Sequence, residues 1–330
     1  MTQQHRILVG DCIEMMRTLP DQSVHTCITS PPYFGLRDYG VDGQIGLEAS
    51  PRAFIESLVA VFREVRRVLR DDGTIWVNIG DSYANDTKWG GSTSGKHVSA
   101  MHGNSGIGRR RTHTGLKSKD LIGIPWRLAI ALQDDGWYLR QDIIWHKPNP
   151  MPESIKDRCT KAHEYLFLLS KNHRYYFDQD AIREPARAQA ATESASRRNS
   201  FARETKYTDG EHGQTAQHRT GRDDVDYDET RNKRSVWTVA TASFKGAHFA
   251  TFPPDLIRPC VLAGSPRGGM VLDPFGGAGT TALVAMQEGR QSVICELNPE
   301  YAALARQRLD TAWIEGAAQM DFLLDQSPAA

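Results

Sequence analysis

The segment Thr29-Ser-Pro-Pro-Tyr33, at the end of the short β-branched run 24–29, has the residue types needed to accept hydrogen bonds from an amine. Two consecutive prolines remove two backbone N–H donors and stiffen the chain, so neighbouring carbonyl oxygens stay free to accept from another molecule. Ser30 adds a hydroxyl and Tyr33 an aromatic ring beside them. The alternative is a plain turn that ends a strand.

A second candidate is the glycine-rich stretch Val271-Leu-Asp-Pro-Phe-Gly-Gly-Ala-Gly-Thr-Thr281, followed 23 residues after Asp273 by Glu296. Glycines let the backbone approach a ligand closely, and the start of the next helix offers unpaired N–H groups. An acidic residue after the next strand can accept hydrogen bonds from a ribose. Because both phosphate-binding patterns, G-x-G-x-x-G and a Lys-Ser/Thr ending, are missing, we expect a nucleoside without a phosphate chain, or else a turn without a ligand.

The segments around these motifs alternate between short apolar runs, which are typical of strands, and stretches whose apolar residues recur at helical spacing. This alternation predicts a parallel sheet covered by helices. We expect strands at residues 6–10, 24–29, 74–79, 137–145, 165–169, 271–272 and 292–295, a hairpin through 175–177, and helices at 11–19, 53–69, 121–132, 281–288 and 299–309.

Two polar stretches interrupt this alternation. Residues 87–119 contain seven basic side chains and no acidic one, which is typical of a loop that contacts phosphates or of a solvated insertion. Residues 186–235 are nearly devoid of aliphatic side chains and read as a linker, a disordered loop or a recognition insert.

The composition predicts a folded protein and argues against disulfide-rich, zinc-binding and membrane-spanning classes. At 330 residues with 39% apolar residues, the chain can bury a full core, and its 40 basic and 40 acidic side chains cancel, so the net charge indicates no partner. The five scattered cysteines lack a CxxC pair, which argues against disulfides and zinc. With neither a signal peptide nor an apolar run of about 20 residues, we expect a cytoplasmic protein without membrane or metal.

Together the motifs resemble those of the amino-methylating DNA methyltransferases, whose signature is Ser, Asp or Asn followed by Pro-Pro-Tyr. Their cofactor loop commonly reads Asp-Pro-Phe-x-Gly-x-Gly-Thr-Thr, as residues 273–281 do here. The catalytic motif precedes the cofactor motif, as in the circularly permuted group often called beta. The resemblance extends to Gly10-Asp11-Cys12 and to residues 73–81, 145–150 and 248–253.

This resemblance implies an α/β fold with a doubly wound, mostly parallel, seven-stranded Rossmann-like sheet, circularly permuted and carrying polar insertions. Residues 1–84 and 120–185 would form the catalytic half and residues 236–330 the cofactor-binding half. Residues 85–119 would be a basic loop insert, and residues 186–235 a polar linker or target-recognition insert.

The family also implies roles for matching residues. The cofactor is S-adenosylmethionine, with Glu296 at its ribose and Asp11 near its adenine; the catalytic residues are Ser30, Pro31, Pro32 and Tyr33. The remaining cofactor-binding residues would be Phe252, Pro253, Asp273, Phe275, Gly277, Gly279 and Thr280. Double-stranded DNA would be the partner, contacted by Arg109, Arg110, Arg111 and Lys117, and a homodimer is expected because dimers are common in this group.

The implied chemistry concerns an exocyclic amine whose lone pair is delocalised into the base. If the Ser30 hydroxyl and the Pro31 carbonyl accept its two N–H bonds, the nitrogen can become pyramidal and attack a sulfonium methyl in line. The base must leave the stack, and stacking on Tyr33 would contribute about 1–3 kcal/mol. Ser-Pro-Pro-Tyr is associated with cytosine N4 and Asp-Pro-Pro-Tyr with adenine N6, so we favour cytosine and keep adenine as the alternative.

Three other activities fit the sequence less well. Carbon-5 methylation needs a cysteine nucleophile, whereas Pro259-Cys260 continues into an apolar run that suits a buried thiol. RNA and protein-glutamine methyltransferases usually place the cofactor loop first. A non-catalytic DNA-binding relative would carry a damaged motif. The sequence also lacks an obvious endonuclease module, so any restriction activity would belong to another chain or be absent.

Overall fold

The computed structural model describes residues 4–35, 40–84, 115–186, 230–241 and 252–325. It forms two compact units, one from residues 1–178 with 234–330 and the other from residues 179–233. In the second unit, the short strands β6 (Glu184–Pro185) and β7 (Thr230–Arg231) pair antiparallel, next to a 3-10 turn, η1 (Asp180–Ile182). Most of the predicted polar insert lies outside the described residues.

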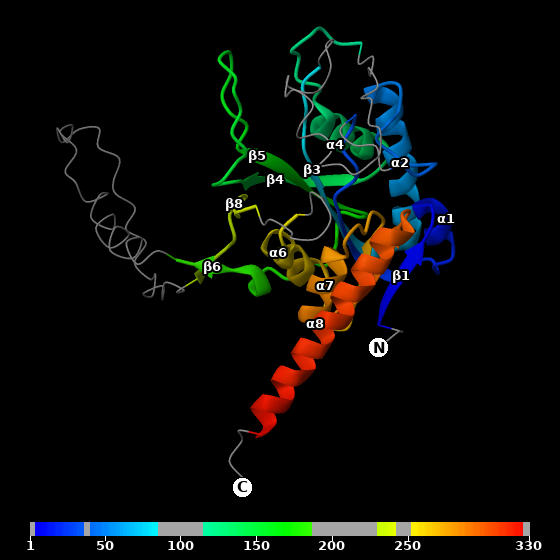
Figure 1. Cartoon of the computed structure of the whole chain (residues 1–330), viewed down its shortest axis with the longest axis vertical. Helices are drawn as coiled ribbons and strands as arrows, with labels where there is room; N and C mark the ends of the chain where they lie inside the picture. Colours follow the sequence, from blue (N-terminus) through cyan, green and yellow to red (C-terminus); the bar gives the residue numbers. More distant parts are fainter. Residues whose placement is uncertain (1–3, 36–39, 85–114, 187–229, 242–251, 326–330) are drawn as a thin grey trace, which may run out of the picture. The chain divides into compact units, whose positions relative to one another are not determined.

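The first unit is built on one eight-stranded sheet (Figure 1). Its strands, in spatial order, are β1 (His5–Val9), β10 (Gln291–Glu296), β9 (Met270–Asp273), β2 (Val24–Thr29), β3 (Leu69–Ile79), β5 (His163–Ser170), β4 (Tyr138–His146) and β8 (Val236–Thr238). The first five strands are mutually parallel, β5 is antiparallel to both neighbours, and β8 is parallel to β4. The predicted permuted α/β fold is confirmed, with β8 added to the seven expected strands.

Helices cover the sheet in two groups (Figure 1). In one group, α2 (Pro51–Val68) packs against both α1 (Cys12–Arg17) and α4 (Ile124–Asp134). In the other, α7 (Thr280–Gln287) packs against α6 (Pro254–Gly264) and α8 (Pro299–Asp325). This is the two-sided covering that a buried parallel sheet requires.

Helix α2 has a capped first turn and the buried apolar face that its helical spacing predicted. Ser50 caps its first turn by accepting a hydrogen bond from the N–H of Ala53, and Pro51 occupies the first turn, where its missing donor costs nothing. Its apolar side chains recur at helical spacing and are buried, among them Phe54 and Leu58.

Two predicted elements differ. The hairpin through residues 175–177 is wrong, because the N–H of Tyr176 donates to Asp72 and that of Asp178 to Ala263, while Phe177 stacks on Trp76. Helix α8 runs on to Asp325, well past the expected end at residue 309. Within the described residues, no helix is long and apolar enough to cross a bilayer, and no group of three metal-ligating side chains is present.

Candidate active site

Both chemistry-bearing motifs line one cleft at the carboxyl ends of β9, β10 and β2, whose empty volume, including the solvent at its mouth, is about 1240 Å³. Ligands of doubly wound sheets bind at this edge. One part of its lining comes from the proline-rich motif, namely Ser30, Pro31, Pro32 and Tyr33. Of the predicted cofactor residues, Asp11, Phe252, Asp273, Phe275, Gly277, Thr280 and Glu296 also line it.

Two predicted cofactor residues do not line this cleft. Pro253 caps the start of α6. Gly279 has a left-handed backbone with φ +76°, and a Cβ there would lie 2.9 Å from the Cβ of Ala305, so glycine lets α8 pack closely. The cleft also includes Val41, Gln44 and Ile45 from the loop before α2, a segment that carries no recognisable motif.

A buried carboxylate joins the two motifs. Asp273 accepts 2.6 Å hydrogen bonds from the hydroxyls of Thr29 on β2 and Thr281 on α7, and one from the N–H of Phe275. Burial raises the pKa of Asp273, and these three donors oppose that rise. The residue before Ser30 is thereby fixed to the strand that begins the glycine-rich turn.

Glu296 organises the turn from the next strand. Its Oε2 accepts from the N–H of Gly277 and its Oε1 from the N–H of Asn298, both at 2.8 Å. Each carboxylate oxygen keeps a second lone pair that can accept from a ligand hydroxyl. Burial raises the pKa of Glu296, with the two N–H donors acting against the rise.

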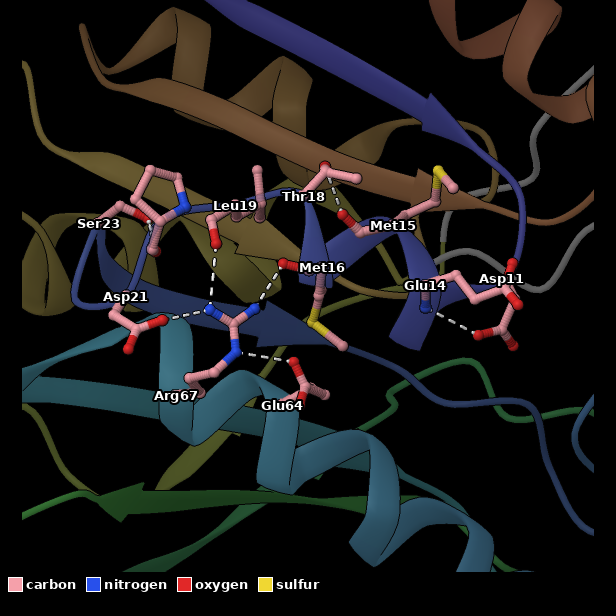
Figure 2. A network of polar contacts seen from close by, with 11 residues as sticks. Asp11, Glu14, Met15, Met16, Thr18, Leu19, Asp21, Ser23, Glu64 and Arg67 are labelled. Atoms are coloured by element: carbon pink, nitrogen blue, oxygen red, sulfur yellow. Dashed lines mark hydrogen bonds and ion pairs between the residues drawn. The ribbon is translucent and has the colours of Figure 1, made fainter.

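Helix α1, which begins beside the cleft, is held at both ends (Figure 2). Asp11 Oδ1 caps it by accepting from the N–H groups of Ile13 and Glu14, both at 3.0 Å. At the other end, Arg67 of α2 donates to the carbonyls of Met16 and Leu19, and it also pairs with Asp21 and Glu64. Asp11 is therefore fixed in the cleft wall, where its carboxylate has further lone pairs that can accept from a ligand.

Tyr33 has a partner that sequence reasoning missed. Its hydroxyl donates to Glu164 Oε2 at 2.7 Å, and Lys147 Nζ lies 2.5 Å from Glu164 Oε1. Burial, followed by the Glu164 carboxylate, raises the pKa of Tyr33 well above its ordinary value. The two residues are 131 positions apart, and Glu164 is the second residue of β5, just before the run Tyr165-Leu-Phe-Leu-Leu169, so no local signal marks it.

The predicted DNA-contacting residues are described only in part. Arg109, Arg110 and Arg111 lie outside the described residues. Lys117 has a side chain that is 87% exposed and forms a 3.0 Å ion pair with Asp120.

The cysteines near the cleft are poor nucleophiles. Burial raises the pKa of Cys12 to about 12 and raises the pKa of Cys295 as well. Because the thiolate is the reactive form, neither thiol can attack a base at neutral pH. Cys260 is buried in α6, as its apolar context predicted.

The cleft fits a nucleoside-type cofactor. Backbone turns at Gly276 and Gly277 leave no side chain on that wall, and Glu296 and Asp11 present carboxylate oxygens to it. Phe275 and Phe252 supply apolar surface. Among the residues that the structure describes, the lining contains neither a lysine nor an arginine that would pair with a phosphate chain.

Comparison with known proteins agrees with this geometry. The pattern of the N6_N4_Mtase family, described as DNA methylase, matches residues 24–307. Type II methyltransferase M.Cfr9I of Citrobacter freundii is 48% identical over 300 residues, covering 91% of this chain and 86% of that protein. Type II methyltransferase M.SmaI of Serratia marcescens is 46% identical over 304 residues, covering 92% and 90%.

Solved structures share the fold. The PvuII DNA methyltransferase, described as cytosine-N4-specific, superposes with a TM-score of 0.60 at 20% identity, over 92% of this chain and 86% of that one. A putative DNA modification methylase of Thermus thermophilus, complexed with S-adenosyl-L-methionine, gives a TM-score of 0.54 at 25% identity, over 93% and 95%. The first likeness, at its low identity, is one of fold alone.

Proposed function

The chain belongs to the N6/N4 DNA methylase family, and we propose that it methylates N4 of cytosine in duplex DNA. It is an S-adenosylmethionine-dependent DNA methyltransferase that modifies an exocyclic amino group. The choice of cytosine over adenine is the proposal, and Ser30 carries it. The Ser-Pro-Pro-Tyr form of the motif supports cytosine N4, whereas adenine enzymes of the family favour an aspartate there.

In this proposal one wall of the cleft binds the cofactor and the opposite wall binds the target base. S-Adenosylmethionine, when bound, supplies an electrophilic methyl group on a sulfonium. Glu296 would accept hydrogen bonds from the ribose hydroxyls and Asp11 one from the adenine amine. Phe252, Phe275, Gly277 and Thr280 would shape the remaining wall.

The opposite wall would receive the target amine. The Ser30 hydroxyl and the Pro31 carbonyl would accept its two N–H bonds, which draws the lone pair out of conjugation and aims it at the methyl. Hydrogen-bond acceptors at this place also stabilise the positive charge that develops on nitrogen. Tyr33 would stack on the base once it has left the duplex.

DNA binding outside the cleft stays a prediction for Lys117 and Arg109 to Arg111. Lys117 is exposed enough to exchange Asp120 for a phosphate. We also propose a homodimer, which analytical ultracentrifugation of the purified chain with and without DNA will test.

Nucleoside mass spectrometry tests the base assignment without knowledge of the recognition sequence. The enzyme is incubated with deuterium-labelled S-adenosylmethionine and long unmethylated phage DNA, which is then digested to nucleosides. We expect labelled N4-methyldeoxycytidine, and it should form about 100-fold more slowly when Ser30→Ala replaces the parent. Labelled N6-methyldeoxyadenosine would overturn the choice of base, and transfer to RNA or protein instead of DNA would overturn the function.

A further inference from the structure

Glu164 gathers three donors from three different elements. It lies second in β5, and because β5 is antiparallel to β3, its first residues share the edge where β2 and β3 end. Its Oε2 accepts from the Tyr33 hydroxyl at 2.7 Å and from Asn78 Nδ2 at 3.3 Å, and its Oε1 accepts from Lys147 Nζ at 2.5 Å.

This cluster is a largely buried ion pair. The side chains of Glu164 and Lys147 are only 15% and 18% exposed, and Lys147 Nζ lies 4.2 Å from the ring centroid of Trp145. Taking two charges out of water costs free energy that their attraction often only just offsets, so such a pair is weak evidence of a stabilising role. The ion pair instead fixes the orientation of the Glu164 carboxylate, and with it the direction of the hydrogen bond that Tyr33 donates.

The ring of Tyr33 is constrained on a second side. A Cβ added to Gly80 at the end of β3 would lie 2.7 Å from Tyr33 Cε2, so the ring packs against bare backbone there. The Gly80 backbone lies beside the ring at Cε2, Cζ and Cδ2, and Glu164 holds the hydroxyl, so the ring is constrained at both places. Tyr33 still lines the cleft beside Ser30.

We infer that Glu164 is a positioning residue for methyl transfer, which holds the Tyr33 ring in place for the extrahelical base and is itself held by Lys147 and Asn78. This inference rests on the proposed function of Tyr33 as the stacking surface. Glu164 contacts neither base nor cofactor in this scheme and acts only through the tyrosine hydroxyl. A misplaced ring would leave the amine out of line with Ser30 and slow the chemical step.

A double-mutant cycle tests whether Glu164 acts through that hydroxyl. Tyr33→Phe, Glu164→Gln and the double variant are compared by single-turnover transfer of tritiated methyl to unmethylated phage DNA. Loss of a hydrogen bond to a charged group predicts a rate lowered about 10-fold or more in each single variant. Glu164→Gln replaces the charged acceptor of this hydrogen bond by a neutral one, and Tyr33→Phe removes its donor. Because both changes act on the same hydrogen bond, the losses should not multiply in the double variant.

Two further readouts separate positioning from loss of structure. The Kd for S-adenosylmethionine, measured by calorimetry, should stay within about twofold of the parent's, and thermal unfolding should show a folded protein. Glu288→Gln serves as the matched control, because Glu288 also forms a partly buried ion pair, with Arg258, outside the cleft. If Glu164→Gln does not fold, Lys147→Met replaces it in the cycle with the same expected non-additivity.

The outcomes distinguish this inference from the proposed function. A parental rate in Glu164→Gln, or losses that multiply in the double variant, would overturn the positioning role while DNA methylation by the parent stands. A parent that transfers no methyl group to DNA would overturn the proposed function itself.

Discussion

The Thr29 hydroxyl donates a 2.6 Å hydrogen bond to Asp273 Oδ1, across the junction of β2 and β9. Thr29 immediately precedes Ser30, and Asp273 begins the turn that contains Phe275. The proposed acceptor for the amine and the glycine-rich wall of the cleft are thus tied together at one buried carboxylate, although 244 positions separate Thr29 and Asp273.

Thr29→Val should destabilise the fold in a pH-dependent way. Burial raises the pKa of Asp273 in the folded protein above its ordinary 3.8. Between pH 3.8 and that raised pKa, the folded state binds a proton more readily than the unfolded state does, so the free energy of unfolding falls as the pH rises. Removing a donor that opposes the rise extends this window upward. We expect a loss of about 1.5–3 kcal/mol in the free energy of unfolding at pH 7, and a smaller loss at pH 4.5.

Urea unfolding at both pH values measures this effect. Thr26→Val is the control, since Thr26 is buried on the same strand and donates to the Thr74 carbonyl rather than to a carboxylate. Its loss should be the same at both pH values. Equal losses for Thr29→Val at pH 7 and pH 4.5 would contradict the carboxylate argument.

Ser30→Ala should slow turnover strongly and leave the affinity for the cofactor unchanged. Losing one acceptor for the charge that develops on the amine predicts a kcat lowered about 100-fold, with the Kd for S-adenosylmethionine unchanged. Initial rates of labelled methyl transfer to DNA measure kcat, and calorimetry measures the Kd for S-adenosylmethionine. Ser57→Ala, which removes a hydroxyl bonded to the Ala53 carbonyl on α2, should keep the parental rate. A Ser30→Ala enzyme as fast as the parent would refute the catalytic assignment.

Glu296→Gln should weaken the cofactor site and remove its pH dependence. In the proposed site, ionised Glu296 would accept hydrogen bonds from the ribose hydroxyls. Because burial raises its pKa above 4.5, the parent's affinity for the cofactor should fall as the pH drops through that raised value. The variant should bind about 10-fold more weakly at pH 7.5 and respond less to acid. Calorimetric titration at pH 7.5 and 5.5 checks both points, with Glu300→Gln on α8 as an exposed control. Parental affinity in Glu296→Gln would remove Glu296 from the site.

Gly80→Ala should displace the Tyr33 ring. The added methyl would lie 2.7 Å from Tyr33 Cε2, closer than real contacts allow, so the ring must move. We expect methyl transfer about 10-fold slower or more, because the stacking surface is lost. In a Tyr33→Ala background the same change should cost little further activity, since the clash is gone. A full additional loss in that background would show that Gly80 acts independently of Tyr33.

Local patterns predicted the cofactor side of the fold well. Strands β9 and β10 are short apolar runs, and the glycines between β9 and α7 mark the turn unambiguously. The same holds for β2, whose apolar run stops at the prolines. These features depend on neighbours in sequence, which is why they could be recognised without coordinates.

Features created by distant pairing were not predictable. Glu164 meets Tyr33 only because β5 enters the sheet antiparallel beside β3. Strand β8 has three residues, too few for any periodicity, and is defined by its pairing with Ile144 to His146. The aromatic run at residues 175–177 has the residue types of a strand, but the N–H of Tyr176 and that of Asp178, just after the run, donate to two separate segments.

The order of strands in the sheet also bears on how the enzyme comes into being. Because β1 pairs with β10 and β2 with β9, strands made first on the ribosome wait for partners made near the end of synthesis. Until then the nascent chain carries an open strand edge at β2, which invites aggregation, and such long-range pairing folds slowly. The cleft therefore lacks its glycine-rich wall until residues 270–296 have been synthesised, and we expect a chain that ends earlier to be inactive and prone to aggregation.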